Sequence, residues 1–235
     1  MDGLFLDFNG LLVDDEHLHL QGFNAVLAPR QIHVSEALYA ERYLGFDDRG
    51  AFEHILRDHG HAPTPPEVDA LIAAKAEVYA SRARSELRVF PGAAELVRAA
   101  AGEGPVAVVS GALRAEVTLG LERLGVRALV GCVVAAEDVA RSKPDPEGYR
   151  AALAWLRCIS PGSEASRVVA LEDSGAGLVA AQAAGLVAVG VAHTYPPEAL
   201  EASGARRVFP SLVGLRVEDL AALVASGGQR GVDCC

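Results

Sequence analysis

The sequence contains four short stretches whose residue types suit phosphate chemistry. The first ends at Asp7, which closes an apolar run that begins at Gly3 and precedes an Asn-Gly turn signal. In open α/β sheets, the end of such a buried strand is where ligands bind. A carboxylate there can hold a hard cation such as Mg²⁺ or attack phosphorus as a nucleophile. It can also simply cap a loop, and Asp7 by itself does not separate these roles.

The other three stretches supply complementary groups. Ser110 and Gly111 follow an apolar run, and their hydroxyl and backbone amide can bind a phosphoryl oxygen. Lys143, inside Ser-Lys-Pro-Asp-Pro, can neutralise charge on the nucleophile and the phosphoryl group. Glu172 and Asp173 end another apolar run and are suitable ligands for Mg²⁺. The alternatives are a serine that caps a helix, a surface lysine and an acid pair at a helix N-terminus.

Strands and helices alternate along most of the chain, and this alternation is what can bring the four stretches together. The pattern predicts helices over 93–101, 115–124, 146–156 and 177–184, and strands over 3–8, 106–110, 129–134, 168–172, 186–191 and 207–209. It therefore predicts an α/β fold with a Rossmann-like parallel sheet covered on both faces. Right-handed crossovers put the carboxyl ends of all strands, and hence the four stretches, at one edge.

A helical insert follows the first strand. Helices are predicted over 16–27, 35–44 and 49–59, and a fourth begins after Thr64, with Pro65 at its first position and Glu67 completing a capping box. That helix is predicted to run to about residue 84. We therefore assign residues 1–13 and 88–225 to the core, 14–87 to a helical cap and 226–235 to a flexible tail.

Composition limits the possible partners. The chain has 235 residues, of which 51% are hydrophobic and 22% charged, as in ordinary globular proteins. Its net charge of −10 argues against nucleic acid as a partner but leaves small phosphorylated substrates open. The sequence shows neither a membrane-spanning run nor a signal peptide, so we expect a cytoplasmic protein with no membrane partner.

The cysteines suit neither a zinc site nor a disulfide framework, which agrees with a reduced cytosolic protein. They are Cys132, Cys158, Cys234 and Cys235. The last two end a glycine-rich tail and could form a prenylation signal, but we expect no lipidation.

The four stretches occur in a fixed order around a cap-sized insertion, and in this the chain resembles the haloacid dehalogenase superfamily. The resemblance covers residues 1–225 and is closest to the helical-cap branch, which includes beta-phosphoglucomutase and many small phosphatases. It implies a mobile cap and an aspartyl-phosphate on Asp7, which is also a metal ligand. It further implies that Asp173 and Glu172 hold Mg²⁺, and that Ser110, Gly111 and Lys143 bind the phosphoryl group.

Asn9 departs from the family pattern Asp-x-Asp-Gly, in which the second acid is the acid/base. The resemblance implies that the Asn9 carbonyl still binds Mg²⁺. An amide cannot exchange a proton near neutral pH, and a positioned acid/base contributes about 10²–10⁴-fold in rate. We expect Mg²⁺ and phosphate binding to persist and turnover to be impaired.

Three explanations for Asn9 remain open: an engineered change, a natural loss of activity, or another group that supplies the proton. The candidates for that group are Asp14, Asp15, His17 and His19. His19 falls where mutase-type relatives carry a histidine at the cap hinge, and the resemblance implies a site role for it; the alternative is a structural histidine on a helix.

The cap segment from Leu44 to Arg49 resembles the segment that meets the substrate in this branch. Arg49 could bind a second phosphate or a sugar hydroxyl. Asp47 and Asp48 could contact a hydroxyl or cap a helix, and they stand near where the mutases carry a Ser-Arg pair. The two histidines of His59-Gly60-His61 could suggest a metal, but an interhelix loop is the simpler interpretation.

The sequence therefore predicts a Mg²⁺-dependent phosphatase of small phosphorylated metabolites, with sugar phosphates the expected class. The alternatives are a phosphosugar mutase of the beta-phosphoglucomutase type and a catalytically silent phosphometabolite-binding protein. The exact substrate stays open, and the protein is expected to be a monomer or a homodimer.

Overall fold

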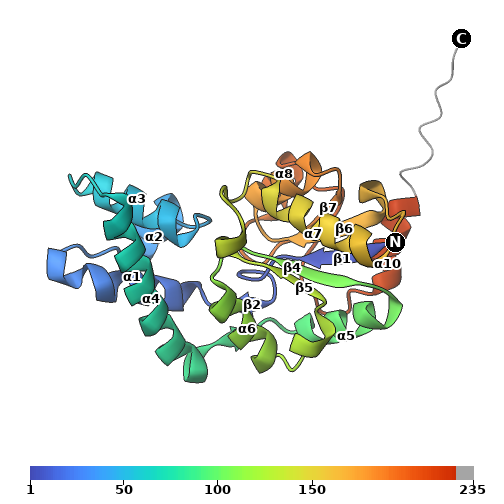
Figure 1. Cartoon of the computed structure of the whole chain (residues 1–235), viewed down its shortest axis with the longest axis horizontal. Helices are drawn as coiled ribbons and strands as arrows, with labels where there is room; N and C mark the ends of the chain where they lie inside the picture. The colour runs from blue at the N-terminus through green and yellow to red at the C-terminus, as the bar shows by residue number, and fades with distance from the viewer. Residues whose placement is uncertain (226–235) are drawn as a thin grey trace, which may run out of the picture.

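The structure, a computed structural model, describes residues 1–225, and the predicted tail with Cys234 and Cys235 lies outside them. Figure 1 shows two lobes: a sheet covered by helices, and a smaller lobe made only of helices. Within the described part of the chain, no helix is both long enough and apolar enough to cross a bilayer.

The larger lobe is built on a six-stranded sheet in the order β5-β4-β1-β6-β7-β8, with every neighbouring pair parallel. The strands are β1 (Gly3–Leu6), β4 (Val106–Val109), β5 (Cys132–Val134), β6 (Val168–Glu172), β7 (Val187–Val191) and β8 (Val208–Phe209). The predicted Rossmann-like parallel sheet is confirmed. β1 lies at its centre and all its residues are buried, as expected for a strand covered on both faces.

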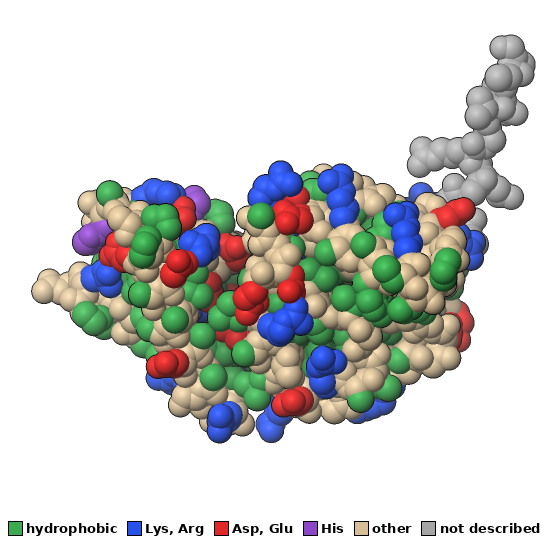
Figure 2. All heavy atoms as spheres, in the orientation of Figure 1, with side chains coloured by type: hydrophobic (Ala, Val, Ile, Leu, Met, Phe, Trp, Pro, Cys, Tyr) green, Lys and Arg blue, Asp and Glu red, His purple; other side chains and the backbone are tan. Residues whose placement is uncertain are grey.

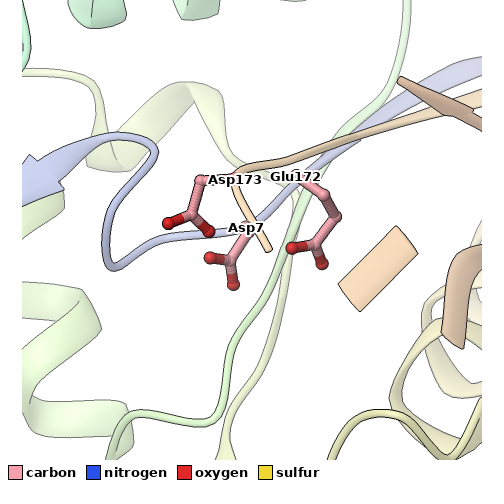
Figure 3. Close-up of side chains that lie close together, drawn as sticks. All are labelled: Asp7, Glu172 and Asp173. Atoms are coloured by element: carbon pink, nitrogen blue, oxygen red, sulfur yellow. The ribbon is translucent and has the colours of Figure 1, made fainter. Parts of the chain in front are cut away.

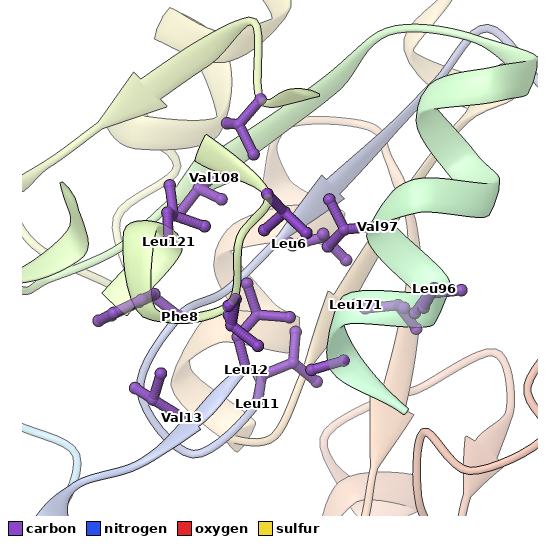
Figure 4. Close-up of a cluster of buried hydrophobic side chains, with 14 of the residues drawn as sticks. Leu6, Phe8, Leu11, Leu12, Val13, Leu96, Val97, Val108, Leu121 and Leu171 are labelled. Atoms are coloured by element: carbon purple, nitrogen blue, oxygen red, sulfur yellow. The ribbon is translucent and has the colours of Figure 1, made fainter. Parts of the chain in front are cut away.

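Helices cover the two faces of the sheet. They are α5 (Ala93–Glu103), α6 (Arg114–Arg123), α7 (Glu147–Ile159), α8 (Gly175–Ala183), α9 (Pro197–Ala202) and α10 (Val217–Ala225). Leu4 and Leu6 of β1 pack in the core on the face of α5, α6 and α10, and Phe5 packs on the opposite face with α7 and α8. Figure 4 shows Leu6 and Phe8 in the first of these cores. Alternate side chains of one strand thus tie both helical layers to the sheet.

Among the strands, the predicted bounds were wrong by two or more residues at β1 and β5; α7 runs three residues past its predicted end, and two helices were missed. β1 ends at Leu6 rather than at residue 8, because the chain turns back and Leu12 N donates to Phe8 O. β5 begins at Cys132 rather than at residue 129, because a 3₁₀ turn occupies Arg127–Leu129. Further 3₁₀ turns lie at Ala28–Arg30, Ala136–Asp138 and Ala165–Arg167. The sequence analysis assigned neither α9 nor α10.

The smaller lobe contains α1 (Glu16–Leu27), α2 (Glu36–Arg42), α3 (Asp48–Asp58) and α4 (Pro65–Glu86) around an apolar core of its own. Thr64 and Glu67 form the predicted capping box at the start of α4. The chain crosses between the lobes through an antiparallel ribbon that was not predicted, in which β2 (Val13–Asp14) pairs with β3 (Arg88–Val89). The smaller lobe is called the cap below.

Candidate active site

Three buried carboxylates meet at the carboxyl edge of the sheet. Asp7 follows β1, and Glu172 and Asp173 end and follow the adjacent strand β6. One oxygen of each lies within 4.8 Å of the others, and Figure 3 shows the three side chains gathered at one point. Because β1 and β6 are parallel neighbours, residues about 165 positions apart come together, as the sequence predicted.

Lys143 provides a positive charge at this cluster. Its Nζ lies 2.6 Å from Asp7 Oδ1 and 2.7 Å from Glu172 Oε1, and it donates to the Val109 carbonyl at 2.9 Å. Burial lowers the pKa of this lysine, but the Asp7 and Glu172 carboxylates outweigh burial and raise it above its usual value. Lys143 is therefore held in its charged form against the nucleophile candidate.

The cluster has the properties of a site for a hard divalent cation. Burial, with the negative charges of its neighbours, raises the pKa of Glu172 to about 7 and that of Asp173 well above its usual range. Three carboxylates facing one ammonium leave an excess of negative charge that a cation with oxygen ligands would neutralise. The cluster lies close to the loop backbone: Gly10 has a φ of +72°, and a Cβ there would come within 2.0 Å of Asp173 Oδ2.

Asn9 lies in a hydrogen-bond network beside the cluster. Ser110 Oγ donates to Asn9 Oδ1 at 3.1 Å and accepts from Ala112 N at 3.0 Å. Asn9 Nδ2 donates to Asp15 Oδ2 at 2.9 Å, and Tyr79 donates to the same oxygen at 2.5 Å. Asn9 thus links the phosphate-binding candidate Ser110 to a fully buried carboxylate at the start of the cap.

His19 and Lys75 form the cap side of this network. His19 Nε2 lies 3.3 Å from Asp15 Oδ2 and 3.1 Å from Asn9 Nδ2, and His19 Nδ1 lies 2.6 Å from Lys75 Nζ. Burial and Lys75 lower the pKa of His19, but Asp15 outweighs them and raises it to about 9. At 2.6 Å the two nitrogens are within hydrogen-bond distance, and each group also faces a carboxylate, Asp15 for His19 and Asp48 for Lys75.

A cavity of about 100 Å³ opens above the carboxylates, between the lobes. Asp7, Asn9 and Lys143 lie on its core side, and Figure 2 shows a hollow between the lobes with acidic side chains along it. Besides the contact of Asn9 with His19, other hydrogen bonds join the cap to the core beside this cavity: Ser142 donates to Asp47, and the Tyr195 hydroxyl lies 3.5 Å from the Leu44 carbonyl. A ligand bound to the carboxylates would therefore contact both lobes.

The structure also places the other predicted residues. Gly111 and His19 line the cavity, whereas Arg49 is exposed and its guanidinium pairs with Asp69 on the outside of the cap. Arg49 therefore makes no contact with the cavity in this arrangement. His59 Nδ1 contacts the Ile55 carbonyl, in keeping with a loop histidine at the end of α3. Among the described residues, the carboxylate cluster is the group found with metal-binding geometry.

Several residues of the site were missed by the sequence analysis. Lys75 is completely buried, Tyr149 donates to Glu172, and Thr194 hydrogen-bonds to Asp173. Lys75 and Tyr149 lie inside ordinary helical patterns, and Thr194 lies in a loop after β7. No motif surrounds them, so a sequence signal for them is absent.

A parallel sheet with buried acids and a lysine at its carboxyl edge, covered by a helical cap, defines a capped α/β protein with a candidate active site between its lobes. The family model described as haloacid dehalogenase-like hydrolase matches residues 4–191. The chain belongs to this family, and the predicted resemblance to its helical-cap branch is confirmed. The predicted class of enzyme, a phosphohydrolase of this family, is also confirmed.

Curated relatives span nearly the whole chain. Validoxylamine A 7'-phosphate phosphatase of Streptomyces hygroscopicus subsp. limoneus is 30% identical over 83% of this chain and 87% of its own. Protein CbbY of Cupriavidus necator is 32% identical over 90% of this chain and 86% of its own. The crystal structure of CbbY from Rhodobacter sphaeroides in complex with phosphate has a TM-score of 0.80 and 28% identity, and covers 92% of this chain and 96% of its own.

Proposed function

We propose that this protein is a Mg²⁺-dependent phosphatase of small phosphorylated metabolites, of the sugar phosphate class, with Asp7 as the nucleophile. The observation that carries the proposal is the charge arrangement around Asp7 at the base of the cavity. Its carboxylate faces the Lys143 ammonium at 2.6 Å and has the carboxylates of Glu172 and Asp173 within 4.8 Å.

The reaction has two steps. In the first, Asp7 attacks phosphorus, an aspartyl-phosphate forms, and the P–O bond to the leaving group breaks as that oxygen gains a proton. In the second, water attacks the same phosphorus, its proton leaves, and Asp7 is regenerated with inorganic phosphate as product. The Lys143 ammonium neutralises charge on Asp7 and on the transferring group, and the Gly111 backbone amide lies at the cavity to bind a phosphoryl oxygen.

Asp7, Asp173, Glu172 and the Asn9 carbonyl would hold Mg²⁺, which supplies charge neutralisation for the phosphoryl oxygens. Tyr149 and Thr194 position Glu172 and Asp173 by hydrogen bonds. Such outer partners fix the orientation of ligating carboxylates.

The slow part of the proposed reaction is the proton transfer to the leaving group. The Asn9 amide donates to Asp15 and cannot itself give or take a proton at the leaving group. We therefore propose that turnover is slow compared with an enzyme that has a carboxyl group at this position. The same observation favours a second candidate function, a phosphometabolite-binding protein that retains the site without appreciable turnover.

The relatives support the choice of substrate class. By their names, the Streptomyces relative acts on validoxylamine A 7'-phosphate, and an Escherichia coli relative of 28% identity is a fructose-1-phosphate phosphatase. A mutant of the Rhodobacter sphaeroides CbbY was crystallised with xylulose-(1,5)bisphosphate. All three names contain a small phosphorylated compound.

The test is phosphate release from a panel of sugar phosphates with and without Mg²⁺. We expect slow release that requires Mg²⁺ and is abolished in Asp7→Asn, a variant of nearly the same size. Binding of the same sugar phosphates without any release, even over long incubation at high enzyme concentration, would favour the silent binding protein. Release that persists in Asp7→Asn would overturn the proposed nucleophile.

A further inference from the structure

The two sides of the cavity differ in charge. The side formed by the core, where the phosphoryl group would bind, contains Lys143, whereas the side formed by the cap, where the leaving group would lie, contains acids. Glu16, Asp47 and Asp48 line the cap side, together with His19. Among the described residues that line the cavity, Lys143 is the only lysine or arginine, and it is already engaged by Asp7 and Glu172. A group bound against the cap therefore meets carboxylates.

The cap carboxylates are only partly compensated. Asp48 accepts from Lys75 through Oδ1 at 2.5 Å, and its Oδ2 is buried without a hydrogen-bond partner. Glu16 accepts only from a neutral hydroxyl, that of Tyr39, at 2.8 Å. The nearby cationic groups are His19 and Lys75, and they already face the carboxylates of Asp15 and Asp48. Negative charge is thus in excess on the cap side.

The cationic residue expected to bind a second phosphate is directed elsewhere. Arg49 pairs with Asp69 on the outer surface of the cap, and Lys75 lies fully buried behind the cavity wall. A second phosphate or a carboxylate on the substrate would face acids without a counter-charge, and like charges at short range repel. A protonated amine or a hydroxyl would find carboxylates there as acceptors, among them those of Glu16 and Asp47.

The same wall presents aromatic side chains. Tyr39 and Phe46 of the cap and Tyr195 of the core line the cavity beside the carboxylates. Aromatic faces pack on the carbon skeleton of a polyol and attract a nearby ammonium group. The combination of carboxylates and rings suits a polyhydroxylated, amine-bearing group.

We infer that the cap side of the cavity selects the substrate by charge, so that the chain takes monophosphate esters of amine-bearing polyols and rejects substrates with a second anionic group. This inference rests on the proposed function, because it assigns the leaving-group half of the same cavity. It separates this chain from a mutase that requires a bisphosphate.

The test is equilibrium binding in the presence of Mg²⁺ at pH 7, where slow turnover is an advantage. Glucosamine 6-phosphate, glucose 6-phosphate and 6-phosphogluconate share a six-carbon skeleton and a terminal phosphate, and differ in charge at the far end. We expect calorimetry to show affinity falling about fivefold or more at each step of this series, the order of one partly screened charge contact.

Isosteric variants locate the effect. Glu16→Gln combined with Asp47→Asn removes charge from the cavity wall, and asparagine retains the capacity of Asp47 to cap α3. We expect the affinities of this double variant for the three compounds to differ by no more than about twofold. Asp69→Asn makes the same chemical change on the outer face of the cap and is expected to leave the ranking unchanged.

The outcomes separate the inference from the proposed function. Equal or reversed affinities in the unmodified chain, or tight binding of fructose 1,6-bisphosphate, overturn the inference. In parallel, Asp7-dependent hydrolysis of p-nitrophenyl phosphate tests the phosphatase chemistry without the charge series. The predicted ranking without any Asp7-dependent hydrolysis would support selection by charge and overturn the phosphatase.

Discussion

The Asn9→Asp substitution is the most direct test of the chemistry. It places a carboxyl group where the amide now hydrogen-bonds with Ser110 and Asp15, next to the phosphoryl site. A positioned acid/base contributes about 10²–10⁴-fold. We therefore expect kcat for sugar phosphate hydrolysis to rise by that factor, equivalent to about 3–5 kcal/mol of transition-state stabilisation.

The surroundings determine the protonation state of the new carboxyl group. The amide nitrogen it replaces lies 2.9 Å from Asp15 Oδ2, where two ionised carboxylates would repel by about 6 kcal/mol at an effective dielectric constant of 20. A shared proton removes this repulsion. We expect Asp15 to raise the pKa of the new carboxyl group and hold it protonated, ready to donate to the leaving group.

The raised pKa of the new carboxyl group makes the stability of the Asn9→Asp variant depend on pH. The folded variant would hold a proton that the unfolded chain loses near the ordinary aspartate pKa of about 4. Its free energy of unfolding, relative to the unmodified chain, should therefore be highest below pH 4 and decline as pH rises through the raised pKa. Urea unfolding of both proteins from pH 4 to pH 8 measures this difference.

The activity assay compares steady-state phosphate release by the unmodified chain and by Asn9→Asp, with Asp7→Asn added to each as a blank. Rates within about threefold of each other, in a variant that remains folded, would refute the reasoning and show that another group supplies the proton. Mutation of His19 would then follow. If neither protein releases phosphate, the phosphatase proposal fails for that panel.

Three further predictions concern the metal, the buried lysine and the packing. Saturating Mg²⁺, at about a hundred times its Kd, should raise the melting temperature by about 5–10 °C, and Asp173→Asn should abolish the rise. Lys75→Met should lower the unfolding free energy in urea by about 3–5 kcal/mol, because it leaves the largely buried Asp48 side chain without its ion pair to the fully buried lysine. Gly120→Ala should cost about 1–3 kcal/mol in the same assay, because its Cβ would lie 2.3 Å from a phenylalanine ring.

Each of these has a matched control. Ca²⁺ at the same concentration tests the preference for the smaller ion, and an equal shift in Asp173→Asn would contradict the assigned ligand. Adding Asp48→Asn to Lys75→Met should recover part of the loss, whereas additive losses would contradict the ion-pair explanation. Gly102→Ala, at an open position on α5, should be neutral or slightly stabilising, and a similar loss there would remove the steric argument.

The site residues that could be predicted are those whose reactive side chain stands at a recognisable point of the local sequence pattern. Asp7, Glu172 and Asp173 each end or follow an apolar run, and parallel strands necessarily bring such ends to one edge. The start of α4 could be predicted for a similar reason, because Thr64 and Glu67 hydrogen-bond to free backbone amides within the first helical turn. Local rules therefore sufficed for the sheet, the cap and the carboxylate cluster.

Tertiary structure alone decided what the cap contributes. The sequence offered Arg49 to the substrate, but α4 supplies Asp69 as its partner on the outer surface. Lys75 is an ordinary helical residue in sequence, and it is buried only because α1 and α3 pack against α4 and bring His19 and Asp48 to it. Long charged side chains reach whichever partner the fold brings near.

The same distinction holds for Asn9. Its type alone established that the chain has an amide in place of the family's acid/base. Its partners Asp15 and His19, and hence the charge that a carboxyl group would meet there, depended on how the chain turns from β1 into the cap. The sequence by itself thus determined the family, the sheet and the meeting of the carboxylates at its edge, because these follow from residue type and strand order. The fold decided the charge of the substrate cavity, because that charge is the sum of contacts between helices that no local pattern encodes.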